Sequence, residues 1–189
     1  NVRYELLLNY CIQHKIKFIM TGHHRDDQIE TFLIRLSRGS GIQGLSSMSK
    51  MTKLNNRIKL FRPLLSEKKE DLVFLSKKYY GKIFKDPSNI NQRYLRTNIR
   101  NLINQLEKNG IKRDQIINSI NNLASTRDTL NSYTQDVEKK CLIKKKIIIS
   151  KNLEIFSLEK NDIQLKILSN CLKHVSKNYY PPRAKKILY

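Results

Sequence analysis

Hydrophobic residues occur at two spacings in the first part of the chain. Residues 16–20 (IKFIM) form a short apolar run with β-branched side chains, which predicts a buried strand. Over residues 26–37, apolar side chains recur every three or four positions, which predicts an amphipathic helix. The apolar stripe of this helix consists of Ile29, Phe32, Leu33 and Leu36.

The same patterns predict the elements around this pair. Residues 58–61 predict a second strand, and helices are predicted over residues 2–14 and 68–80. The polar residues 46–56 predict a mobile loop between the two strands. The alternation of strands and helices predicts an α/β layer with parallel strands.

The second half of the chain is predicted to be mainly helical. Helical patterns cover residues 94–108, 111–141 and 163–175. Residues 147–149 and 153–158 predict a small pair of β-strands. We place a domain boundary near Gly110, which gives one domain over residues 1–110 and a second region over residues 111–189.

Imidazole and carboxylate side chains follow the first predicted strand. At about 100° per helical residue, His23, Asp27 and Glu30 fall on one face, beside the apolar stripe. Open α/β sheets bind ligands at the C-terminal ends of their strands, so this face is a candidate site. A second interpretation stays open, in which the acids only cap a helix and line a solvated face.

A glycine-rich segment, residues 39–44, ends the same helix. It matches the pattern G-x-G-x-x-G, but a dinucleotide-binding loop opens a helix and this segment closes one. The segment therefore predicts a helix C-cap and a tight loop. Arg38 precedes it and could place the loop against a phosphate backbone.

Arginines share one side of the helix predicted over residues 94–108. Arg93, Arg96 and Arg100 are three and four positions apart, which suits either a solvated basic face or an edge that grips phosphates. The turn formed by residues 86–89 (DPSN) precedes them.

The composition points to an acidic partner. The chain has 189 residues and a formal net charge of +21, for which nucleic acid is the default partner. No apolar run in this sequence is long enough to span a membrane, and no charged-then-apolar segment predicts a secretory signal. The three widely spaced cysteines argue against a disulfide scaffold or a metal cluster and predict a reducing, cytoplasmic location.

Three stretches together resemble the tRNA(Ile)-lysidine synthases, which are N-type ATP pyrophosphatases. The first stretch covers residues 21–45 and contains TGHH, DDQ, ET and RGSG. The second joins RPLL at 62–65 to DPSN at 86–89, and is followed by Arg96, Asn98, Ile99 and Arg100. The third is YPPR at 180–183. The resemblance implies the C-terminal part of a parallel-sheet ATP pyrophosphatase domain, similar to the adenine nucleotide alpha hydrolases. A mainly helical linker that contacts tRNA would follow over residues 111–189.

The resemblance also implies a reaction. These enzymes use ATP with Mg²⁺ to adenylate the wobble cytidine of a CAU-anticodon isoleucine tRNA, and L-lysine then displaces AMP from C2. The phosphate-binding Ser-Gly-Gly-x-Asp-Ser loop of the family does not occur in this sequence. We therefore expect the chain to be a fragment of a longer protein and to be inactive alone.

Roles for individual residues follow from the same resemblance. It implies a catalytic set of His23, Asp27 and Glu30 and no metal held by protein side chains. Asp27 and Glu30 would also hold the lysine ammonium group, which needs carboxylate partners. The other substrate-binding residues that it implies are Arg38, Asp86, Asn89, Arg96 and Arg100.

Three other functions stay open from the sequence. A related ATP pyrophosphatase that thiolates tRNA is one, although such relatives often need cysteine pairs, which this chain lacks. A non-catalytic basic RNA-binding module is another. The third is a metal hydrolase whose ligands would be His23, His24, Asp26 and Asp27.

Overall fold

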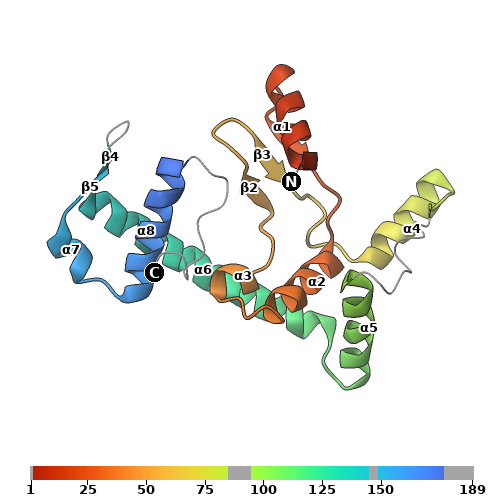
Figure 1. The fold of residues 1–189 in the computed structure, drawn as a ribbon. Helices are drawn as coiled ribbons and strands as arrows, with labels where there is room; N and C mark the ends of the chain where they lie inside the picture. Colours follow the sequence, from red (N-terminus) through yellow and green to blue (C-terminus); the bar gives the residue numbers. More distant parts are fainter. Residues whose placement is uncertain (1, 85–94, 145–148, 177–189) are drawn as a thin grey trace. The chain divides into compact units, whose positions relative to one another are not determined.

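The computed structural model describes residues 2–84, 95–144 and 149–176 (Figure 1). The chain forms two compact units, Asn1–Thr126 and Arg127–Tyr189. Helix α6 (Arg113–Cys141) includes the point at which the units divide. The domain boundary at residue 110 stays a prediction, and each unit is described by itself below.

The first unit contains a small mixed sheet. Its strands are β1 (Phe18–Met20), β2 (Met51–Lys53) and β3 (Lys59–Phe61), in the order β1-β3-β2. Strands β1 and β3 are parallel, as predicted, and β2 is antiparallel to β3. The prediction of a mobile loop over residues 46–56 was wrong, because this segment contains β2 and the buried residues Ser46 and Ser47.

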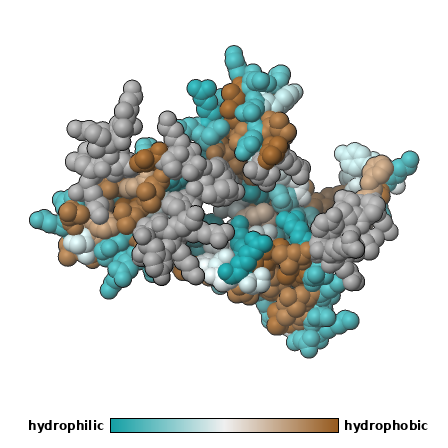
Figure 2. All heavy atoms as spheres, in the orientation of Figure 1, coloured by the Kyte–Doolittle hydropathy of each residue, from teal (hydrophilic) through white to brown (hydrophobic). Residues whose placement is uncertain are grey.

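Strand β1 differs from the buried strand that its apolar sequence predicts. Phe18 is 46% exposed and Met20 is 68% exposed. Side chains two apart lie on the same face of a strand, and no described element covers this face of β1. Hydrophobic surface is also visible over helix α1 (Val2–Gln13) in Figure 2, where Val2 and Leu6 are exposed.

Helices pack into the core of the first unit. They are α2 (Arg25–Leu36), α5 (Leu95–Lys108) and the first part of α6. Helices α3 (Ile42–Leu45) and α4 (Lys69–Tyr80) contribute no buried residue. The buried cluster consists of Ile29, Leu33, Ile99, Ile103, Ile116 and Ile120, from α2, α5 and α6. Leu36, the last residue of the apolar stripe predicted for α2, is half exposed and does not belong to this core. Helix α4 ends, as predicted, at Gly81, whose φ of 67° favours glycine.

The second unit has its own hydrophobic core. Strands β4 (Leu142–Lys144) and β5 (Ile149–Lys151) form an antiparallel pair, and helices α7 (Leu153–Ser157) and α8 (Asn161–Ser176) follow. The core consists of Val137, Cys141, Leu142, Phe156, Ile163 and Ile167. The strand predicted over residues 153–158 was wrong, because Asn152 caps a helix there by accepting hydrogen bonds from two backbone N–H groups. None of the described helices is long and apolar enough to cross a membrane.

Candidate functional site

The first turn of α2 is fixed by two reciprocal caps. His24 is the N-cap residue, and its Nδ1 accepts a hydrogen bond from the Asp26 backbone N–H at 3.2 Å. Asp27 Oδ2 accepts the His24 backbone N–H at 2.9 Å. Asp27 is therefore a helix cap as well as a site candidate. Its hydrogen bond to the His24 backbone fixes the carboxylate at the start of α2, which follows β1.

Two acids of α2 meet two arginines of α5, and we call these four residues the acid–arginine cluster. Arg100 Nε donates to Glu30 Oε1 at 2.5 Å. Arg96 lies farther away, with Nη1 3.9 Å from Asp27 Oδ1 and Nε 4.0 Å from Glu30 Oε2. Residues 70 positions apart are thus brought together, because the apolar stripes of α2 and α5 pack in one core.

Glu30 is the most deeply buried member of the cluster. The residue is 2% exposed, although it carries a carboxylate. Its Oε2 atom is buried and receives no hydrogen bond from any described residue. Because an unsatisfied buried carboxylate oxygen is costly, this atom is a point at which a ligand donor would be bound favourably.

His23 lies at the edge of the same cluster. Burial lowers its pKa below the usual 6.5, and the positive charges of Arg62 and Arg96 lower it further, while Asp27 acts in the opposite direction. The imidazole is therefore mostly neutral at pH 7. Its Nδ1 lies 2.8 Å from the Thr21 hydroxyl oxygen. When Nδ1–H donates to this hydroxyl, Nε2 is left as a proton acceptor.

The other predicted site residues lie apart from the cluster or outside the described residues. Arg38 is exposed and follows the C-terminal end of α2, whereas His23 precedes its first turn. Asp86 and Asn89 lie outside the described residues. The roles assigned to all of these residues stay predictions.

Sequence reasoning missed the side chains that fix the loop at residues 44–48, where the glycine-rich segment ends. Gln28 both donates to the Met48 carbonyl and accepts from the Met48 N–H, each at 2.8 Å. Arg35 Nη1 donates to the carbonyls of Gly44 and Ser47. Since backbone groups satisfy these polar side chains, the loop is held firmly against α2. No local signal in the sequence indicates these contacts, because the partners lie 9 to 20 positions away.

A crossed pair of salt bridges joins α2 to the start of α6. Arg25 pairs with Asp114, and Arg113 pairs with Asp26 at 3.2 Å. Arg113 also donates to Glu107 of α5 at 2.9 Å. Sequence reasoning missed this contact as well, and it ties the first turn of α2 to both neighbouring helices.

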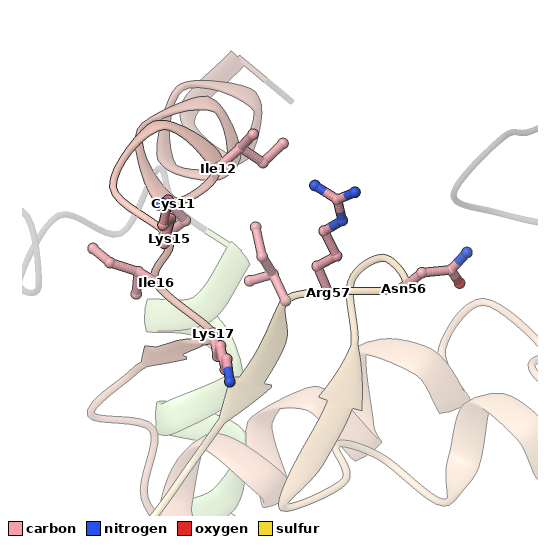
Figure 3. Close-up of a pocket in the computed structure, with 8 residues that line it drawn as sticks. Cys11, Ile12, Lys15, Ile16, Lys17, Asn56 and Arg57 are labelled. Carbon is pink, nitrogen blue, oxygen red and sulfur yellow. The ribbon is translucent and has the colours of Figure 1, made fainter.

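A surface hollow lies away from the cluster (Figure 3). Lys17 and Ile58, which line it, precede the parallel strands β1 and β3, so it lies at the ends opposite to the site. Figure 3 shows Arg57 extending from the β2–β3 turn beside α1. The hollow and the acid–arginine cluster are therefore separate features.

Comparison with known proteins gives a family and a fold. A family model described as the PP-loop domain matches residues 1–107. The U34-tRNA thiolase NcsA from Methanococcus maripaludis, solved with its [4Fe-4S] cluster, matches with a TM-score of 0.51 and 21% identity. The match covers 66% of this chain and 42% of that chain. It supports the predicted ATP pyrophosphatase fold.

Curated relatives match more of the chain. The tRNA(Ile)-lysidine synthase of Wolbachia pipientis wMel is 33% identical over 96% of this chain and 42% of its own length. The tRNA(Ile)-lysidine synthase of Orientia tsutsugamushi is 43% identical over 55% of this chain and 23% of its own length. The chain thus spans less than half of the length of these relatives. The resemblance to the tRNA(Ile)-lysidine synthases that the sequence motifs indicated is confirmed. With more than half of its residues matched by the family model, the chain belongs to the PP-loop family of ATP pyrophosphatases.

Proposed function

We propose that this chain is part of a tRNA(Ile)-lysidine synthase. Such an enzyme uses ATP to join L-lysine to C2 of the wobble cytidine in a CAU-anticodon isoleucine tRNA. The 33% identity to the Wolbachia enzyme over 96% of this chain supports the assignment. The structural observation that carries it is the buried, unsatisfied Oε2 of Glu30 beside Asp27.

A lysine ammonium group fits this feature chemically. It carries a positive charge and three N–H donors, and charge-assisted hydrogen bonds to carboxylates are the strongest that proteins form. Glu30 Oε2 supplies one acceptor, and Asp27 Oδ1 has only Arg96 at 3.9 Å as a described ion-pair partner. We therefore assign both carboxylates to the lysine side of the reaction.

The chemistry requires a base as well as a binding site. ATP, with Mg²⁺ on its phosphates, first adenylates the C2 oxygen and releases pyrophosphate. The bound ammonium group must first lose a proton, because only the free amine has a lone pair. The amine then forms the new C–N bond, the C2–O bond to AMP breaks, and a second proton must leave the nitrogen. His23 suits this last role because its lowered pKa keeps the imidazole neutral at pH 7.

The test uses the natural gene product that contains this chain. It is incubated with ATP, radiolabelled lysine and a CAU-anticodon isoleucine tRNA, and the label in tRNA is counted. We expect ATP-dependent labelling of this tRNA and none of a matched tRNA with a GAU anticodon. Release of pyrophosphate without lysine incorporation would reject the assignment and would leave tRNA thiolation as the alternative.

A further inference from the structure

We propose that Arg96 acts as an internal substitute for the substrate ammonium. It neutralises Asp27 and Glu30 while no lysine is bound, and it leaves them when a phosphate group binds to it. Phosphate binding and lysine binding then strengthen each other. This inference rests on the proposed function and concerns how the same site is regulated.

The two arginines of the cluster are held very differently. Arg100 makes a 2.5 Å hydrogen bond to Glu30, and its side chain is 33% exposed. Arg96 lies 3.9 Å and 4.0 Å from its two carboxylate partners, and its side chain is 53% exposed. Since these separations exceed a hydrogen bond, Arg96 is attracted by charge and is not locked by direct bonding.

Charge balance indicates which group must move. The two carboxylates and the two guanidinium groups cancel, and the neighbouring His23 is mostly neutral at pH 7 because its pKa is lowered. An added ammonium group would leave one uncompensated positive charge beside Glu30, which is 2% exposed. One cation therefore has to leave, and the more exposed Arg96, which donates no described hydrogen bond, leaves most readily.

The position of Arg96 favours a phosphate as its second partner. The residue lies in the first turn of α5, where the helix dipole attracts anions. A guanidinium group offers a planar set of donors that matches two phosphate oxygens. Both ATP and tRNA supply phosphate esters, so either can move Arg96 away from the acids.

The experiment measures lysine affinity by calorimetry in the natural gene product. Lysine is titrated alone, with a non-hydrolysable ATP analogue, and with unmodified tRNA. Coupled sites typically change each other's affinity by roughly 5- to 150-fold, and we expect tightening in this range for at least one phosphate ligand. The ligand that produces the effect identifies the source of the phosphate.

Substitution then tests the residue itself. In Arg96→Gln, lysine affinity should no longer depend on the phosphate ligand. Arg57→Gln is the matched control, because Arg57 is exposed at the opposite end of the strands and should leave the coupling intact.

Two results would overturn the inference alone. These are wild-type lysine binding that no phosphate ligand tightens, and full coupling in Arg96→Gln. Absence of lysine binding by the wild type under every condition would instead reject the proposed function, and this inference with it.

Discussion

Replacing Glu30 with glutamine removes the charge of the most buried acid in the cluster and keeps its shape. The glutamine can still accept the hydrogen bond from Arg100, so the packing of α2 on α5 should persist. What is lost is the charge on Oε2, which has no described hydrogen-bond donor of its own. A hydrogen bond to a charged group contributes about 1.5–3 kcal/mol. Lysine affinity should therefore weaken roughly tenfold to a hundredfold.

The assay is a lysine titration of the transfer reaction at fixed tRNA and ATP, with pyrophosphate release followed in parallel. Pyrophosphate release should change less, because adenylation precedes the entry of lysine into the reaction. Glu107→Gln is the matched control, since it removes the same charge from α5 at a side chain that is 38% exposed and paired with Arg113. An unchanged lysine dependence in Glu30→Gln would refute the assignment of this carboxylate to the lysine site.

Three further predictions concern the base, the partner and the loop. In a pH–rate profile, the rate of lysine transfer should be level above pH 7 and should fall as pH drops through the lowered pKa of His23. Arg96→Gln removes a neighbouring positive charge, so the pKa of His23 should rise and the fall in rate should move to higher pH. Affinity for tRNA, measured by filter binding, should drop steeply as salt rises, because a chain of net charge +21 binds mainly phosphates, and a constant affinity would contradict this. Gly44→Ala would place a Cβ 2.6 Å from Ser40 Cβ, so it should reduce the free energy of unfolding by about 1–3 kcal/mol and lower the heat-inactivation temperature. In the control Gly41→Ala, the new Cβ meets nothing within 4 Å, so the heat-inactivation temperature should stay unchanged.

Local spacing was sufficient to predict the helices that carry the site. The three- and four-residue periodicity placed α2 and α5 almost to the residue. It also placed Asp27 and Glu30 on one face, and the structure shows both facing Arg96. These features depend on neighbours within one helix, which a sequence records directly.

Features that depend on distant partners could not be read in this way. The apolar run at β1 predicts burial, but burial also requires a covering element, and none of the described elements covers Phe18 and Met20. Gln28 finds its partner Met48 20 positions away, and Arg25 finds Asp114 89 positions away. Helix α7 was a different case, since Asn152 is a local capping signal that the sequence contained.

The most direct test of the proposed function identifies the nucleoside that the enzyme makes. The natural gene product is given unmodified CAU-anticodon isoleucine tRNA, ATP, L-lysine and a sulfur donor together, and the digested tRNA is analysed by mass spectrometry. The proposed function predicts that cytidine gains lysine with loss of water and that Glu30→Gln lowers the yield at limiting lysine. A thiolated nucleoside, or cytidine left unmodified while ATP is consumed, would contradict it.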